Sequence, residues 1–548
     1  MSLKSHAVAA FLYAVLTALM TWPLAARLHL MEAGDSSYFA WAMAWTSRAL
    51  LHDPLSLPHA NTLHPLRYTL FLDEPIVATS ALSLPLRLFT SDPIVLLNAV
   101  RLLTFFLTAL GVRALGLSLG LTPLAAFAVG AWFSFSSNRV STPAHLSVLG
   151  TQFLPWYFLF LHRWARSGTA PSAALAGLFF GLSAWACGYQ ALLAAAVLPI
   201  PILILIERGR VLRTAPIGVG VALAFLLPLR FLHQQALAPL NYERAAGETA
   251  FFSAPLEGLF STAASNRVWG AATESLRSIV EGDLFQGITI LVLAGLALLS
   301  LRKAPKNRRL ILGYAALALS GWLVALGPEI RLFGHSLSPG PFAWLREFEV
   351  FRMIRVPARA SVFLALGVSM LAGFGLDRIR RTGWRVLLAA LVLLEAASAP
   401  LNVVAAERCI DASAPVPAVY AWLAGQPGNG AVIELPILPN DGLFQRPRFD
   451  DSVYLLRSTA HWKPLVNGYA GVEPAEYARV REIMKDFPSE SSIALLRSLG
   501  VEHVIVHLRG FGPIRRKAIE DGLLGFAADL RPAERFEDDL ALEIAPKS

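Results

Sequence analysis

One acid lies where the chain first leaves a long apolar stretch: Asp35, directly after Gly34. The apolar stretch 7–26 precedes it, and the residues 38–51 after it space their apolar side chains as a helix in a membrane interface would. A carboxylate at this boundary would reach the headgroup of a lipid and could act as general base towards an acceptor hydroxyl. Asp is also a favoured helix N-cap, so Asp35 could instead cap the helix 36–51, and the two roles are compatible.

Two adjacent acids, Asp73 and Glu74, come just before Pro75 and a second predicted interfacial helix, 76–89. In the first turn of that helix they would complement its dipole. They could instead hold a divalent metal that bridges a phosphate, or contact the substrate directly. The chain contains neither a DxD nor an HExxH spacing here. The sequence therefore predicts no metal or other cofactor, and the divalent metal is the weaker alternative.

Three arginines gather at the outer end of one apolar span: Arg352, Arg355 and Arg359. Their guanidinium groups match the geometry of a phosphate, and the alternative is snorkelling to the membrane surface. Three cations on the outer side are more than snorkelling requires, so the pattern predicts a phosphate-binding set. Tyr242 and Arg244, in a long outer loop, are further candidates for substrate contact.

Four more residues are candidates for substrate contact. His145 and Tyr189 lie at outer ends of apolar spans, where polar groups are costly unless they face protein or a cavity. An interfacial anchor is the plainer interpretation of each. His461 and Tyr469 belong to the motif HWKPLVNGYAG, whose Gly and Asn suit a tight turn. An aromatic beside hydrogen-bonding groups also suits sugar stacking, and both interpretations stay open.

The composition is that of a membrane protein. Of the 548 residues, 55% are hydrophobic and only 16% are charged, where soluble domains carry about 25%. The net charge of +9 comes from short loops between apolar blocks rather than from one basic face, so no nucleic-acid partner is expected. The two cysteines, Cys187 and Cys409, imply neither a thiolate metal site nor a disulfide framework.

About eleven apolar stretches are long enough to cross a bilayer. They are 7–26, 94–116, 122–137, 146–162, 172–187, 189–206, 214–231, 285–301, 310–326, 359–376 and 384–402. The basic loops HRWARSG, ERGRVLR, RKAPKNRR and RIRRTGWR all fall on one side, which predicts a cytoplasmic N-terminus. The first stretch is expected to stay as a helix rather than be cleaved as a signal peptide.

An odd number of spans places the polar tail outside the cytoplasm. We therefore expect a mainly α, polytopic membrane domain over 1–402, with a long first outer loop at 27–93. The tail, 403–548, contains the strand-like runs AVIELP, EHVIVHL and LALEIA between helical segments. It is predicted to be a small extracytoplasmic α/β domain.

The order of the motifs resembles one family over nearly the whole chain. The motifs are GDSSYFAWAMAW, NTLHPLRYTLFLDEP, SSNRVSTPAHLSVLGTQFLPW, EGDLFQG, FRMIRVPARAS, HWKPLVNGYAG and EHVIVHLRG. They resemble a poorly characterised group of bacterial membrane proteins similar to the GT-C glycosyltransferases. Such enzymes take a sugar from a polyprenyl-phosphate carrier and place a catalytic Asp or Glu in the first outer loop, a position that Asp35 matches.

The resemblance implies an inverting enzyme of the bacterial cytoplasmic membrane. Its partners would be a polyprenyl-phosphate sugar donor, an envelope lipid or polysaccharide acceptor, and membrane lipids. The chain departs from the metal-using members, because their paired acidic motif is missing. The alternative is a protein without catalytic activity, either an envelope scaffold or a transporter of lipid-linked glycans. A transporter would need polar groups at mid-membrane depth, which most spans lack.

Overall fold

The computed structural model describes residues 3–206, 211–240, 244–277, 281–302, 306–401, 409–438 and 450–545. The chain forms two compact units. Unit 1 comprises Met1–Arg27, Asn98–Leu229 and Glu243–Val403, and unit 2 comprises Leu28–Leu97, Arg230–Tyr242 and Val404–Ser548. The division into 1–402 and 403–548 is not tested by this grouping and stays a prediction.

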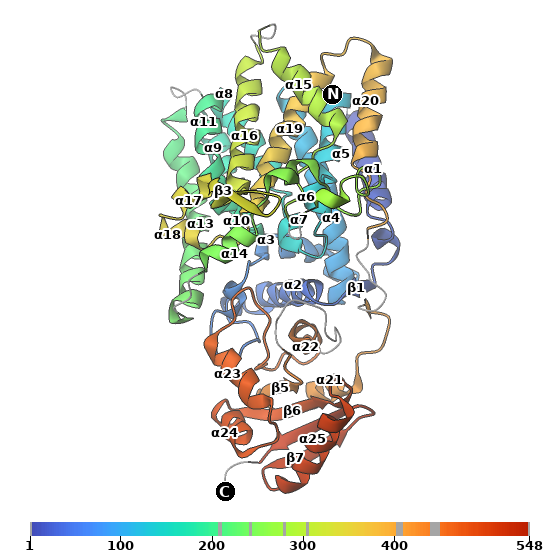
Figure 1. Cartoon of the computed structure of the whole chain (residues 1–548), viewed down its shortest axis with the longest axis vertical. Helices are drawn as coiled ribbons and strands as arrows, with labels where there is room; N and C mark the ends of the chain where they lie inside the picture. The colour runs from blue at the N-terminus through green and yellow to red at the C-terminus, as the bar shows by residue number, and fades with distance from the viewer. Residues whose placement is uncertain are drawn as a thin grey trace. The chain divides into compact units, whose positions relative to one another are not determined.

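Unit 1 is built almost entirely of helices (Figure 1). Its long apolar helices, two of which extend into unit 2, are α1 (Leu3–Met20), α4 (Pro93–Ser118), α5 (Pro123–Ser134), α8 (Leu154–Ser167), α9 (Ala170–Ala186), α10 (Gly188–Val197), α11 (Pro199–Leu205), α13 (Ala215–Leu237), α15 (Ile288–Leu299), α16 (Arg308–Ala325), α19 (Ser361–Leu376) and α20 (Thr382–Glu395). Short elements between them are α6 (Ser137–Val140), α7 (Leu146–Leu149), α14 (Ala246–Phe251), β2 (Glu329–Leu332), β3 (His335–Pro339), α17 (Pro341–Leu345), α18 (Glu349–Arg352) and η9 (Pro357–Ala360).

Several helices have the length and composition of membrane spans. Among the described residues, five are long and apolar enough: Leu3–Met20, Pro93–Ser118, Ala215–Leu240, Arg308–Ala325 and Pro357–Leu376. A sixth results if α10 and α11, bent by 65° against each other, count as one span. A helix occupies part of each of the stretches predicted from sequence, but α5 and α15 have only 12 residues each. The chain is thus a polytopic helical membrane protein, and the number eleven stays a prediction.

Helix α19 forms the core of unit 1. All 16 of its residues are buried, and it packs against α15 and α16. Small residues allow this close approach: a Cβ atom at Gly367 would lie 2.6 Å from the Tyr314 carbonyl oxygen and 2.7 Å from the Ala318 nitrogen. Such small-residue contacts are the usual way in which helices associate in lipid, where no hydrophobic effect drives them together.

The close contact at Gly367 can be tested by substitution. We expect Gly367→Ala to destabilise the protein by about 1–3 kcal/mol, because the new methyl group would press α19 away from the α16 backbone. Gly295 in α15 is the matched control, since a Cβ there meets nothing within 4 Å. Gly295→Ala should be neutral or stabilising by roughly 0.5–1 kcal/mol through its helix propensity. Equal unfolding midpoints of the two variants in detergent would contradict this packing.

Unit 2 combines most of the long loop 27–93 with the tail. Its elements are β1 (Leu30–Glu32), α2 (Asp35–His52), α3 (Val77–Ser80), η4 (Ala81–Ser83), η5 (Pro85–Leu88), β4 (Cys409–Asp411), α21 (Ala418–Gly425), β5 (Ala431–Leu435), α22 (Asp451–Ser458), α23 (Ala475–Met484), α24 (Glu490–Ser498), β6 (Val501–His507), α25 (Pro513–Gly525), β7 (Leu530–Arg535) and β8 (Asp539–Ile544). The loop and the tail are joined by the antiparallel pairing of β1 with β4.

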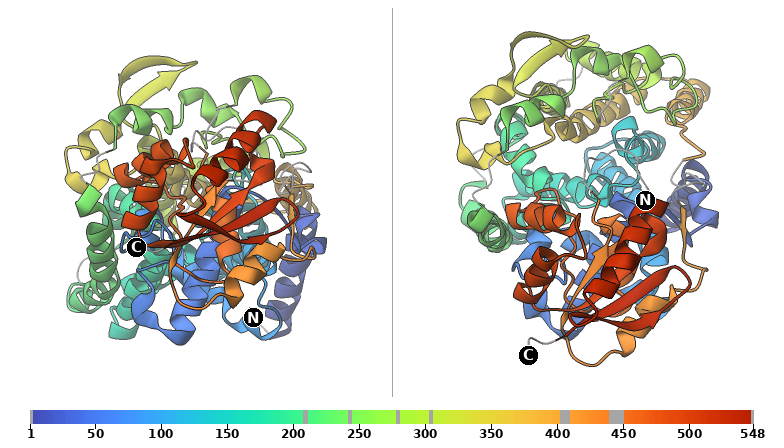
Figure 2. Two further views of the ribbon diagram at one scale, coloured as in Figure 1. Left: turned by 90° about the horizontal axis from the view of Figure 1, so that it is seen from below. Right: turned by 60° about the horizontal axis from the view of Figure 1, so that its bottom comes forward.

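A four-stranded sheet in the order β5-β6-β8-β7 forms the core of the tail (Figure 2). Strands β5 and β6 pair in parallel, and the other neighbours are antiparallel. The runs AVIELP, EHVIVHL and LALEIA correspond to β5, β6 and β8, so these three predicted strands are confirmed. Helix α2 confirms the predicted helix 38–51, whereas 76–89 is divided among the short turns α3, η4 and η5.

Candidate functional site

The start of α2 fixes the position of Asp35. Gly34 is the N-cap residue, with a φ of +96° that favours glycine, and it makes no side-chain capping bond. Asp35 is the first residue of the helix itself. The interpretation of Asp35 as N-cap is therefore wrong, although its carboxylate still lies in the first turn, where a negative charge complements the helix dipole.

The Asp35 carboxylate contacts the tail. The hydroxyl of Tyr469 donates a hydrogen bond of 2.6 Å to Asp35 Oδ1, a length typical of bonds to a charged acceptor. Burial raises the pKa of Tyr469, and the negative charge of Asp35 raises it further, so the phenol stays protonated and remains a donor. The ring of Tyr38, one turn along α2, lies 5.9 Å from that of Tyr469. The bond thus fixes the orientation of the Asp35 carboxylate, which the sequence predicts to be a general base.

Asn467 holds the loop that carries Tyr469. Its Nδ2 donates to the Glu434 carbonyl (2.9 Å) and to Asp451 Oδ1 (3.0 Å), and its Oδ1 accepts from the Glu434 nitrogen (2.7 Å). The loop 27–93 contacts the backbone of the same residue, because Thr62 Oγ1 and the Leu63 nitrogen both donate to the Asn467 carbonyl. A side chain with every polar atom satisfied leaves this loop little freedom. The tight-turn interpretation of the HWKPLVNGYAG motif agrees with these contacts.

Buried Asp451 gives this loop a dependence on pH. Burial raises the pKa of Asp451 to about 7, which the hydrogen bonds from Tyr477 and Asn467 only partly offset. An unfolded Asp loses its proton near pH 3.9, so between about pH 4 and 7 the folded protein binds one proton more than the unfolded chain. The unfolding free energy should therefore fall by up to about 1.4 kcal/mol per pH unit as the pH rises from about 4 to 7. Above about pH 7, Asp451 should cause no further fall.

Asp451→Asn is expected to remove this component, because the amide does not titrate. Chemical unfolding of the full chain in detergent, repeated from pH 4.5 to 8, measures the effect as the difference between the wild-type and variant slopes. Parallel slopes for the two proteins would show that Asp451 does not carry a raised pKa.

The acids Asp73 and Glu74 lie in the same unit but not in a helix. Asp73 Oδ1 accepts from the Glu74 nitrogen (2.7 Å), and its Oδ2 accepts from the Gly471 nitrogen (3.2 Å) in the Tyr469 loop. Helix α3 begins only at Val77, so the expectation that they form its first turn is wrong. Within the described ranges, no group of three or more His, Cys, Asp or Glu side chains is arranged to hold a metal ion.

In unit 1, two of the predicted arginines contact the same carboxylate. Arg355 Nε lies 2.7 Å from Glu248 Oε1, and Arg244 Nη1 lies 3.2 Å from both oxygens of the same carboxylate. Two guanidinium groups thus share one negative charge. The Arg355 guanidinium also lies 4.4 Å from the ring centre of Phe252, which holds it in place. The neighbouring candidate Tyr242 lies outside the described residues.

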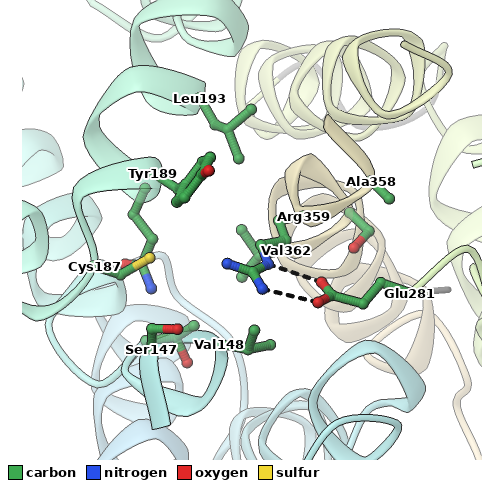
Figure 3. A pocket seen from close by; sticks show the side chains of 12 residues that line it. Ser147, Val148, Cys187, Tyr189, Leu193, Glu281, Ala358, Arg359 and Val362 are labelled. Carbon is green, nitrogen blue, oxygen red and sulfur yellow. Dashed lines mark hydrogen bonds and ion pairs between the residues drawn. The ribbon is translucent and has the colours of Figure 1, made fainter. Parts of the chain in front are cut away.

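Arg359 is paired differently. Its Nε and Nη2 each donate a 2.8 Å hydrogen bond to Glu281, in the two-pronged geometry that arginine makes with a carboxylate (Figure 3). Burial raises the pKa of Glu281, but the charge and hydrogen bonds of Arg359, with His145 and Arg355, outweigh it and hold the net pKa below its usual range. The pair lines a pocket together with Tyr189, whose ring centre lies 5.4 Å from the guanidinium.

The remaining candidates are more scattered. Arg352, at the exposed end of α18, donates from Nε to the Arg346 carbonyl. His145 precedes α7 and lies near enough to Glu281 to help lower the pKa of that carboxyl. His461 accepts from the Lys463 nitrogen through Nδ1, and burial lowers its pKa to about 4, so it is a neutral turn residue. In unit 2, the structure thus brings Asp35 together with Tyr469, and Asp73 together with the loop that carries Tyr469. In unit 1, it brings together Arg244, Arg355, Arg359 and Tyr189.

Comparison with known proteins identifies the fold. No protein-family model matches the chain, and no curated protein sequence matches it. Arabinofuranosyltransferase AftD from Mycobacteria matches 100% of this chain in structure, with a TM-score of 0.62 and 15% sequence identity. The chain has the GT-C glycosyltransferase-like fold. This GT-C-fold chain spans 40% of the length of AftD. ArnT from Cupriavidus metallidurans also aligns, with a TM-score of 0.49, 13% identity and coverage of 99% of this chain and 98% of ArnT.

Proposed function

We propose that this GT-C-fold protein is a membrane glycosyltransferase that moves a sugar from a polyprenyl-phosphate donor to a lipid or glycan acceptor of the bacterial cell envelope. The observation that carries the proposal is the carboxylate of Asp35, which begins α2 in the first outer loop and is oriented by the 2.6 Å bond from Tyr469. AftD, which shares the fold, is an arabinofuranosyltransferase. The protein would act on the outer side of the cytoplasmic membrane, with a cytoplasmic N-terminus and an extracytoplasmic tail.

In the proposed reaction, Asp35 takes the proton of the acceptor hydroxyl. The acceptor oxygen attacks the anomeric carbon of the sugar, and the bond from that carbon to the phosphate oxygen breaks. The electron pair leaves with the polyprenyl phosphate, and a single displacement of this kind inverts the anomeric carbon. The hydrogen bond from Tyr469 to Asp35 Oδ1 would hold the carboxylate in the orientation in which it accepts the proton.

The departing phosphate needs positive charge. Arg355 is the strongest candidate, because it shares the carboxylate of Glu248 with Arg244 instead of having a carboxylate to itself. The side chain of Arg355 is 38% exposed, so a ligand can reach it. Phosphate contacts by Arg352 and Arg359, and substrate contacts by Asp73, Glu74, His145 and Tyr189, stay predictions.

The test is a transfer assay with the purified full chain in lipid nanodiscs. It supplies radiolabelled polyprenyl-phosphate sugars one at a time, with envelope-lipid extracts as acceptors. We expect the label to move to an acceptor from at least one donor, with release of polyprenyl phosphate. Absence of transfer with every donor and every extract would instead support the envelope scaffold.

A further inference from the structure

The pocket beside Arg359 differs in charge from the cluster around Glu248. It is lined by the Arg359–Glu281 pair, Tyr189, Gln190, Thr151 and Ser147, among others (Figure 3). One guanidinium and one carboxylate cancel, so the pair brings no net charge to the pocket, whereas Arg244 and Arg355 share one carboxylate. A phosphate favours excess positive charge, so the neutral Arg359–Glu281 pair is a poor site for one.

Two residues of the pocket wall each have a buried polar atom with no hydrogen-bond partner among the described residues. The atoms are Thr151 Oγ1 and Gln190 Oε1, on residues that are 2% and 6% exposed. The orientation of the Gln190 amide is set by its other end, because Nε2 donates to the Gly150 carbonyl at 3.2 Å. A flipped amide would place two acceptors against each other, so the unpartnered atom of Gln190 is an acceptor oxygen.

A group that supplies hydrogen-bond donors is therefore the ligand that this wall lacks. A phosphate has only acceptor oxygens when ionised and would meet Gln190 Oε1 and the Glu281 carboxylate unfavourably. A sugar hydroxyl both donates and accepts, so it can satisfy Gln190, Thr151 and the Arg359–Glu281 pair together. The Tyr189 ring adds the apolar surface on which a sugar ring packs.

Tyr189 also connects this pocket to the phosphate candidate. The Tyr189 hydroxyl accepts a 3.2 Å hydrogen bond from the backbone nitrogen of Arg355, and the Tyr189 ring lies beside the Arg359 guanidinium. A ligand that places a phosphate at Arg355 would thus have its next group at the pocket. We propose that the pocket binds the sugar of the lipid-linked donor, that Thr151 and Gln190 recognise its hydroxyls, and that a neutral sugar is preferred over an acidic one. This inference rests on the proposed function.

Thr151→Val is the sharpest test, because the hydroxyl it removes has no partner in the part of the chain that the structure describes. The probes are undecaprenyl phosphate, the same lipid carrying a neutral pentose or hexose, and the same lipid carrying a uronic acid. Affinity is measured by microscale thermophoresis on the full chain in detergent. We expect the neutral-sugar lipid to bind wild type more tightly than the other two probes. We expect Thr151→Val to weaken only the neutral-sugar lipid, by about three- to tenfold for one lost hydrogen bond, with an unchanged or higher unfolding midpoint.

Thr108→Val is the matched control. Thr108 is fully buried in α4, its hydroxyl also has no partner, and it does not line the pocket. The Thr108→Val variant should bind all three lipids as tightly as wild type does. If Thr151→Val lowered the affinity for all three lipids equally, the pocket would be a phosphate site and the sugar assignment would be wrong. Tighter binding of the uronic acid lipid than of the neutral-sugar lipid would also contradict the assignment. If wild type binds bare undecaprenyl phosphate but gains nothing from any sugar, the sugar pocket fails while carrier binding stands. Failure to bind any of the lipids would reject the proposed function as well.

Discussion

Replacing Asp35 by Asn is expected to lower sugar transfer by about 100-fold or more while the protein stays folded. Asn has nearly the same shape, and its carbonyl oxygen can still accept the hydrogen bond from Tyr469. The N-cap of α2 is Gly34, so the substitution removes no capping bond. What disappears is the basic oxygen that would accept the proton of the acceptor hydroxyl. The measurement is the rate of transfer with the best donor and acceptor found for wild type.

Asp53→Asn is the control for this experiment. Asp53 follows the last residue of the same helix, in the same loop, and its side chain accepts from the Leu55 nitrogen, a bond that Asn can also accept. It should transfer sugar at the wild-type rate. The transfer rate of Tyr469→Phe should lie between those of the two Asn variants, at roughly a tenfold loss, because the Asp35 carboxylate is kept but loses its fixed orientation. Full activity in Asp35→Asn, with an unchanged unfolding midpoint, would mean that the base lies elsewhere.

The sequence was sufficient for features that depend on local pattern. The apolar stretches predicted helices that the structure contains, and three short apolar runs predicted β5, β6 and β8. The edge strand β7, with the sequence LRPAER, was missed because most of its residues are exposed and it lacks an apolar run. The turns at 76–89 were predicted as one helix, since the apolar spacing alone does not show that Pro85 begins a separate turn.

Long-range pairings could not be predicted from the same patterns. Asp35 was marked by its position after an apolar stretch, but nothing local connects it with Tyr469, which lies 434 residues further along. Glu281 was missed altogether as a site residue. The only signal was an acid in the EGDLFQG motif before a predicted span, and such an acid more often faces solvent. Only the fold shows that this acid neutralises Arg359, and that Arg355 and Arg244 compete for Glu248.

Removal of the Glu281 carboxylate should reveal how strongly the Arg359 pair is buried. The side chains of Arg359 and Glu281 are 14% and 10% exposed, so Glu281→Ala would leave a nearly buried cation without its partner. The expected cost is about 3–5 kcal/mol of unfolding free energy. Replacing both residues by Met should recover much of this loss, because two apolar side chains need no partner.

Glu482→Ala provides the contrast. Lys485 and Glu482 are 55% and 71% exposed, and water screens such a pair, so its loss should cost about 1 kcal/mol or less. Chemical unfolding of the full chain in detergent measures both variants against wild type. If Glu281→Ala cost no more than Glu482→Ala, the Arg359–Glu281 pair would be solvated rather than enclosed. The pocket would then offer a ligand a hydrated surface, and the unpartnered Thr151 and Gln190 atoms would be satisfied by water instead of by sugar hydroxyls.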